Sequence, residues 1–185
     1  MRKKLLFGIS MFVCFLLLVR IYMLNIQYPQ AQIKVVKIGE ILKLDSYNVR
    51  MISWEWKDSS ILKGIAPDYS VMTDVDGSDY PEEKEKVAFA KLEIIKTTDN
   101  NEGFDITTIA LESGGWNNQW DAVLYEELNG DESFYLQMKK GESKEITIPV
   151  VLYDFQFHYK DWMEVNQRNF NIVFTNYPIK RMIVV

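Results

Sequence analysis

Two short stretches of the chain carry side chains that could do chemistry. The first is TDVDGSDYPEE, in which Asp74, Asp76 and Asp79 surround Gly77. Carboxylate oxygens at alternating positions can wrap a calcium ion, and glycine permits the sharp turn that such a loop needs. The full calcium-loop pattern also places a bidentate glutamate at its twelfth position, and this stretch lacks that register. We therefore expect a solvated acidic turn and no cofactor, with weak calcium binding by the three aspartates as the alternative.

The second stretch is SGGWNNQWD, which brings Trp116 and Trp120 close to Asn117 and Asn118. Indole rings beside amides suit the face of a sugar or an apolar anchor of a protein partner. These four residues are the candidate binding site. The alternative is that one or both tryptophans fill a core, as large aromatic side chains in all-β domains usually do, while the glycine pair makes a turn.

No set of catalytic residues can be assigned from the sequence. His158 is the sole histidine, and a hydrolase triad needs a histidine beside a nucleophile and a carboxylate. The sole cysteine, Cys14, lies inside the apolar N-terminal run. The chain has no glycine-rich phosphate loop, His-Glu-x-x-His or Gly-x-Ser-x-Gly motif. We expect a protein that is not an enzyme. Its many carboxylates leave one alternative, an envelope enzyme that acts on glycans through acidic residues.

The elements that must position these side chains are mostly strands. Apolar residues alternate with polar ones in several segments, and this period of two is typical of strands with one face toward a core. Turn sequences such as DNNEG, LNGDES and KKGES separate the segments. A succession of short strands and turns predicts a sandwich or barrel. The predicted strands lie in KVAFAKLEII, SFYLQMK, KEITIPVVLY and NFNIVFT and at 32–38, 47–56, 104–111 and 180–185, and FHYKDWMEVNQ could add a turn or two of helix.

The N-terminal segment predicts where in the cell the protein is located. Three basic residues precede an apolar run, and residues 5–24 are long enough to cross a bilayer if Arg20 extends its guanidinium to the interface. No small-residue cleavage pattern follows, so we expect an uncleaved anchor. The positive-inside rule places the N-terminus in the cytoplasm and the remainder outside the cell membrane. We thus divide the chain into a basic start and transmembrane anchor (1–25), a stalk (26–31) and an extracytoplasmic domain (32–185).

The charge of the predicted outer domain limits its partners. Four of the 21 basic residues lie in the anchor, which leaves 17 basic and 26 acidic residues outside it, a net charge of −9. Such a domain repels nucleic acid at long range, so we expect no nucleic-acid partner. It has no cysteine and must be held together by its core.

Four quoted segments appear in a familiar order: IGEILKLDSYNVRMISWEW, KVAFAKLEIIKTTDNNEGFDITTIAL, LQMKKGESKEITIPVVL and NFNIVFTNYPIKRMIVV. In this order the chain resembles uncharacterised single-pass membrane proteins of Gram-positive bacteria that have an immunoglobulin-like (telokin-like) ectodomain of unknown function. The resemblance covers residues 28–185. It implies an all-β fold, an immunoglobulin-like antiparallel β-sandwich after one N-terminal transmembrane helix, and a surface location. It implies no catalytic residue.

Together these observations predict a membrane-anchored extracytoplasmic binding or accessory domain of the cell envelope. We expect its partner to be an envelope or membrane protein. The alternatives are the glycan-acting envelope enzyme and a structural module stabilised by calcium.

Overall fold

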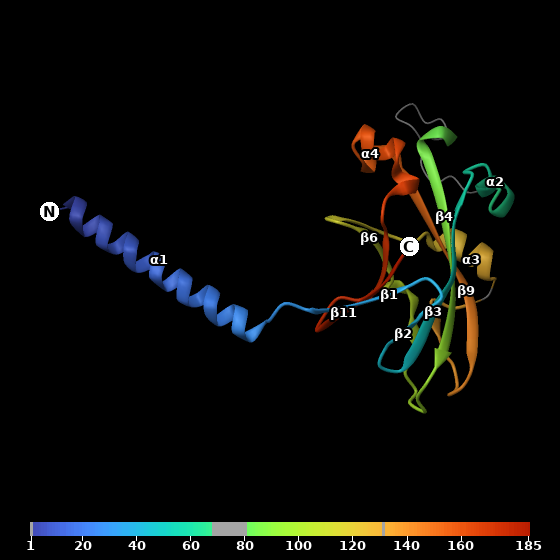
Figure 1. The fold of residues 1–185 in the computed structure, drawn as a ribbon, viewed down its shortest axis with the longest axis horizontal. Helices are drawn as coiled ribbons and strands as arrows, with labels where there is room; N and C mark the ends of the chain where they lie inside the picture. The colour runs from blue at the N-terminus through green and yellow to red at the C-terminus, as the bar shows by residue number, and fades with distance from the viewer. Residues whose placement is uncertain (1, 68–80, 131) are drawn as a thin grey trace.

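The chain folds into a β-sandwich preceded by one long helix, as Figure 1 shows. This computed structural model describes residues 2–67, 81–130 and 132–185. Helix α1 (Arg2–Gln27) comes first, and its segment Phe7–Gln27 is long and apolar enough to cross a membrane. The three aspartates of the predicted calcium loop lie outside the described residues, so that site stays a prediction.

Two sheets form the sandwich. The five-stranded sheet has the order β1-β11-β10-β6-β7, the four-stranded sheet has the order β2-β3-β4-β9, and β5 pairs with β8 alone. The strands are β1 (Gln32–Lys37), β2 (Ile41–Lys43), β3 (Tyr47–Lys57), β4 (Glu85–Lys96), β5 (Phe104–Asp105), β6 (Ala110–Ser113), β7 (Trp116–Gln119), β8 (Tyr135–Leu136), β9 (Ser143–Tyr153), β10 (Asn171–Thr175) and β11 (Ile179–Val184). Most of the predicted strands are therefore confirmed.

One strand pairing differs from the predicted all-antiparallel arrangement. Strand β1 runs parallel to β11, with Gln32 opposite Ile179 and Lys37 opposite Val184. The chain enters the sandwich from α1 at this edge, and β1 lies beside the last strand rather than beside β2 in the same sheet. Parallel neighbours need a long connection. Here almost the whole domain forms that connection.

The core lies between the inner faces of the two sheets. Alternation along each long strand sends one set of side chains inward, and Val49, Leu92, Ile148 and Ile172 are each at most 1% exposed. In β3 a bulge between Met51 and Ser53 shifts the phase, so that Trp54 and Trp56 also face the core. The tryptophan pair therefore packs inward.

Short helices cover the outer face of the four-stranded sheet. Helices α2 (Ile61–Ile65) and α3 (Ala122–Asn129) place Leu62 and Leu124 over Val87 and Val151. We did not predict α3 from the sequence, because its eight residues make only about two turns, too few for a helical period to be decisive. Its start is nevertheless a standard cap, in which the Leu124 amide donates to the Asp121 carboxylate over 3.0 Å.

The predicted strand at 104–111 is wrong as a single element. Asp105 accepts a hydrogen bond from the Thr107 amide at 2.9 Å and caps a 3₁₀ turn, which divides the segment into β5 and β6. A side chain that bonds the backbone two residues on competes with strand pairing. The remaining short helices are η1 (Glu82–Lys84), η2 (Ile106–Thr108), η3 (Asp154–Gln156), α4 (Tyr159–Met163), which confirms the predicted helical turn, and η4 (Val165–Gln167).

Candidate functional site

The residues predicted to bind a partner lie on and just after β7, an edge strand of the five-stranded sheet. Alternation places Trp116, Asn118 and Trp120 on the inner face, while Asn117 and Gln119 point outward and are exposed. The four predicted residues therefore do not form one surface.

Both tryptophans are half-buried and pack against the core. The ring of Trp116 lies 4.9 Å from that of Phe157, and the Trp120 ring lies 5.2 Å from Tyr125. The Trp120 indole N–H donates to the Ile106 carbonyl at 3.0 Å. These contacts give each ring an internal role. Binding by these residues stays a prediction.

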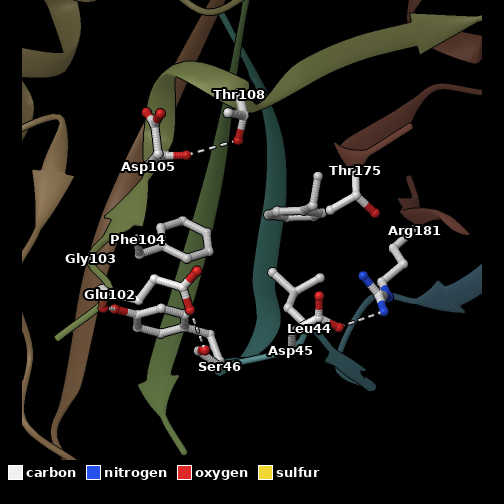
Figure 2. A pocket seen from close by; sticks show the side chains of 12 residues that line it. Leu44, Asp45, Ser46, Glu102, Gly103, Phe104, Asp105, Thr108, Thr175 and Arg181 are labelled. Carbon is white, nitrogen blue, oxygen red and sulfur yellow. Dashed lines mark hydrogen bonds and ion pairs between the residues drawn. The ribbon is translucent and has the colours of Figure 1, made fainter. Parts of the chain in front are cut away.

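A different part of the sandwich contains a pocket with a charged wall. It lies between the start of β3, the loop that follows β4, and the ends of β10 and β11, as Figure 2 shows. Its cavity volume is about 170 Å³. Its lining combines aromatic rings with three carboxylates, hydroxyl groups and one guanidinium. The lining residues are Leu44, Asp45, Ser46, Tyr47, Glu102, Gly103, Phe104, Asp105, Thr108, Phe174, Thr175 and Arg181.

Arg181 is the cation of this pocket. Its place in β11 puts it on the inner face together with Ile179 and Ile183, at the border of the core. The side chain is 12% exposed, and its Nη2 donates to Asp45 at 2.8 Å, where the aspartate side chain is 85% exposed. The buried Nε has no hydrogen-bond partner among the described residues. The guanidinium of Arg181 thus has only an exposed carboxylate as its partner on the solvent side, and its buried Nε is unpaired in the described structure.

The carboxylates of the pocket have fixed donors. Glu102 accepts hydrogen bonds from the Ser46 hydroxyl at 2.7 Å and from Asn100 Nδ2 at 3.0 Å. Asp105 accepts from the amide and the hydroxyl of Thr107, at 2.9 and 2.6 Å. Both groups therefore hold the pocket in shape.

A buried lysine stands behind this wall. Lys96 at the end of β4 is 1% exposed, and its Nζ donates to Asn100 Oδ1 at 2.6 Å, the Glu102 carbonyl at 2.5 Å and the Tyr47 hydroxyl at 3.2 Å. The same Nζ lies 4.3 Å from the centre of the Tyr47 ring. All three acceptors are uncharged, and two of them belong to the loop after β4. Lys96 thereby fixes the loop that carries Glu102.

Sequence reasoning missed this pocket, although a signal was present. Lys96 continues the inward phase of Leu92 and Ile94, and Arg181 lies between Ile179 and Ile183 in the same way. A cation in the apolar phase of a strand must find partners inside the fold or line an opening. Two such cations, on strands from different sheets, could have indicated a polar site.

In the described part of the chain, no group of three or more histidine, cysteine, aspartate or glutamate side chains is arranged to hold a metal ion. His158 lies at the start of α4, apart from the pocket. The pocket thus has one cation that can donate to a further acceptor and several acceptors that are already occupied.

The sequence matches the model of a family described as "Domain of unknown function (DUF5028)" over residues 42–181, and the chain belongs to that family. None of the curated proteins matches it. Several solved structures are similar to this chain. A conserved hypothetical protein from Bacillus anthracis has 14% identity and a TM-score of 0.47, covering 79% of this chain and 93% of its own.

Two further neighbours have similar values. An uncharacterised β-sandwich protein from Clostridium difficile has 15% identity and a TM-score of 0.44, covering 84% of this chain and 96% of its own. A "putative lipoprotein" from Bacillus subtilis has 10% identity and a TM-score of 0.52 over 81% of this chain, which spans only 39% of that protein. At 10% identity, the likeness to the Bacillus subtilis protein shows the fold alone.

Proposed function

We propose that this member of the DUF5028 family is a membrane-anchored, extracytoplasmic binding domain of the cell envelope, with an immunoglobulin-like sandwich and no catalytic activity. Its Arg181 pocket holds a polar group that projects from an envelope or membrane protein. The observation that carries the proposal is the incomplete pairing of a nearly buried guanidinium at the mouth of a small cavity.

The anchor is supported by the length and composition of α1. Its 21-residue apolar segment Phe7–Gln27 has a mean hydropathy of 2.2. At 1.5 Å per residue this segment is about 32 Å long, close to the hydrocarbon thickness of about 30 Å. Basic residues before it favour a cytoplasmic N-terminus. The same fold in the Bacillus subtilis neighbour, described as a "putative lipoprotein", supports an envelope location.

The size of the cavity indicates what kind of group it can take. Pockets for cofactors and drug-sized ligands span roughly 300–1,000 Å³. A cavity of about 170 Å³ has room for one side chain or a part of a sugar. Recognition of a single projecting group suits a protein that binds a partner over a wider surface and uses the pocket for one contact.

The charges around the cavity select among such groups. Asp45, Glu102 and Asp105 outnumber Arg181 in the lining, and Lys96 stands behind it. The negative lining would repel a free carboxylate, whereas it would not repel a neutral oxygen acceptor. An amide or a hydroxyl group can accept from Arg181 and also donate to an acidic oxygen. We therefore expect an asparagine, glutamine, serine or threonine side chain, or a sugar hydroxyl on the partner.

Arg181 can exchange its present partner at little cost. Ion pairs with an exposed carboxylate contribute about 0–1 kcal/mol. A buried donor without an acceptor costs about 1–3 kcal/mol. A partner oxygen that replaces Asp45 breaks only this weak ion pair. When it also accepts a hydrogen bond from Nε, the free energy gained exceeds the free energy lost with the ion pair.

The test is site-specific photocrosslinking in cells that produce the full-length anchored protein. A benzophenone amino acid replaces Thr108, an exposed residue of the pocket rim. We expect a discrete crosslinked partner, and Arg181→Met should remove it while keeping the aliphatic stem in place. Arg50→Met is the matched control, since Arg50 forms an exposed ion pair with Glu93 on the other sheet.

Two results would contradict the proposal. Equal crosslinking in the wild type and in Arg181→Met would show that the pocket does not bind the partner. Release of sugars from peptidoglycan by the anchored protein, lost in Glu102→Gln, would instead establish the glycan-acting enzyme.

A further inference from the structure

We propose that the turn between β10 and β11, with Tyr177 at its tip, rests in the headgroup layer of the bilayer and that Tyr28 lies beside it at the same depth. Strand β1 then presents Lys34 and Lys37 to anionic lipid. This inference rests on the proposed anchoring by α1.

The linker limits how far the sandwich can lie from the membrane. Helix α1 ends at Gln27 and β1 begins at Gln32, with only residues 28–31 between them. The Tyr28 amide donates to the Leu24 carbonyl at 2.8 Å, which continues the helical pattern by one residue. A fully extended chain from Gln27 to Gln32 reaches about 18 Å. The start of β1 is therefore held within that distance of the helix end.

The β10–β11 turn is fixed to this same point. The Gln32 amide donates to the Pro178 carbonyl at 3.1 Å, and Gln32 is opposite Ile179 in the parallel ladder. Figure 1 shows the turn beside the linker, at the side of the sandwich that faces α1. Helix α4 and the β2–β3 turn lie away from it. The turn is thus the part of the sandwich that the covalent tether brings nearest to the bilayer.

The exposed side chains of this region suit the membrane interface. Tyr177 is 57% exposed and Tyr28 is 60% exposed. Tyrosine is enriched at both membrane interfaces, where the ring is in a partly apolar layer and the hydroxyl remains hydrated. Ile33, which follows Gln32 on β1, is 64% exposed and adds an apolar side chain at the same end.

Charge is segregated toward this edge of the domain. Residues 22–39 and 170–185 contain no aspartate or glutamate, although the domain as a whole has a net charge of −9. Lys34 and Lys37 are exposed, whereas Lys180 and Arg181 are paired with Glu112 and Asp45. Lys34 and Lys37 are on the exposed edge strand β1. Basic residues close to an anionic bilayer are attracted to it, and carboxylates are repelled. The neighbouring strands β1, β11 and β10 contain no acidic residue, and β1 is the strand joined to the anchor.

The experiment places a fluorescent label at single cysteines in the full chain. Cys14→Ala removes the native thiol, and Tyr177→Cys, Leu18→Cys and Tyr159→Cys are labelled with NBD and reconstituted into nanodiscs with lipids that carry a nitroxide on the headgroup. Position 18 reports insertion of α1, and position 159, on the exposed face of α4, reports a site away from the linker. We expect quenching at position 177 at least threefold stronger than at position 159.

The outcomes separate the inference from the proposed anchoring. If NBD at position 18 has the blue-shifted emission of a membrane-inserted label while position 177 is quenched no more than position 159, α1 spans the bilayer and the inference is wrong. If position 18 is also in water, the anchoring fails and the inference fails with it.

A charge reversal tests the lipid preference. Quenching at position 177 should be stronger in phosphatidylglycerol nanodiscs than in phosphatidylcholine nanodiscs, and Lys34→Glu should remove this difference. Lys160→Glu on exposed α4 is the matched control and should leave the difference unchanged. An equal effect of both variants would show that only net charge matters and would overturn the proposed orientation.

Discussion

Lys96 and Arg181 are both cations in the inward phase of a strand, yet their surroundings differ. Lys96 is 1% exposed and donates to three uncharged acceptors. Arg181 has a single carboxylate partner, which is 85% exposed, and a buried Nε without an acceptor in the described structure. A buried cation with every donor occupied stabilises the fold. One with incomplete pairing at an opening can bind a partner at little cost to the fold.

The same contrast applies to two aromatic residues that touch each other. Trp120 donates its indole N–H to a carbonyl, while the hydroxyl of Tyr125 is buried without a hydrogen-bond partner in the described residues. Their rings lie 5.2 Å apart. Truncation of the well-paired member of each pair should be costly, and truncation of the incompletely paired member should not.

The largest effect is expected for Lys96→Ala. The change removes three hydrogen bonds and leaves a cavity where the lysine stem packs, so the free energy of unfolding should fall by about 3–4 kcal/mol. Urea denaturation of the sandwich domain in the full chain measures it. Lys91→Ala is the control on the same strand, since Lys91 is 45% exposed and paired with exposed Glu145. It should cost less than about 0.5 kcal/mol. An equal loss of stability in both variants would show that Lys96 does not have this structural role.

Trp120→Ala follows, with an expected loss of about 3 kcal/mol. The indole is half-buried, so the cost should lie at the low end of the range for large aromatic truncations. Asn117→Ala, on the outward face of the neighbouring strand β7, should change the stability by less than about 0.5 kcal/mol. Thermal melts of the two variants measure both changes in stability. If Trp120→Ala melts like the wild type but loses its partner, the binding role predicted from the sequence is correct.

The sandwich could be predicted because its strands and turns can be recognised from short segments of sequence. The alternation of apolar and polar residues along β3, β4, β9 and β10 is visible within each strand, and the turns are visible in the residues between the strands. Whether Trp116 and Trp120 face inward depends on strand phase as well, but the segment is only four residues long and the polar Asn118 shares their face. Four residues are too few to reveal which side is apolar.

The pocket could not be predicted in the same way. It joins Asp45, Glu102 and Arg181, which are far apart in the chain and meet only through the order of strands in the two sheets. The parallel position of β1 beside β11 is a matter of long-range topology too. Sequence phase could identify Arg181 as an unusual inward cation, but it could not show that Asp45 lies beside it.

Tyr125→Phe tests the incompletely paired aromatic residue. Burial, with a smaller contribution from the Glu132 charge, raises the pKa of Tyr125 to about 12. The folded state then keeps its proton between about pH 10 and 12 while the unfolded state loses it, so stability is retained below pH 10 and falls as the pH rises to 12. A shift of about two pKa units corresponds to a loss of about 3 kcal/mol at most.

The phenylalanine variant separates this loss from other alkaline effects. At pH 7 it should be as stable as the wild type or more stable by about 1 kcal/mol, because the unpaired hydroxyl is removed. Between pH 10 and 12 its stability should fall less steeply than that of the wild type. Urea titrations at several pH values measure both quantities. A destabilised variant at pH 7 would mean that the hydroxyl has a partner, for example a bound water.

The smallest effect on stability is expected at the pocket, where the effect on binding should be the largest. Arg181→Met and Asp45→Ala should each change the free energy of unfolding by less than about 1 kcal/mol, because the ion pair is exposed on its aspartate side. They should change crosslinking from position 108 in opposite directions. Arg181→Met removes the donor and should abolish capture, whereas Asp45→Ala removes the internal competitor and should raise capture about threefold. Since the two variants break the same ion pair, loss of that pair alone would affect them equally. If both lower capture alike, the ion pair shapes the pocket and Arg181 does not itself contact the partner.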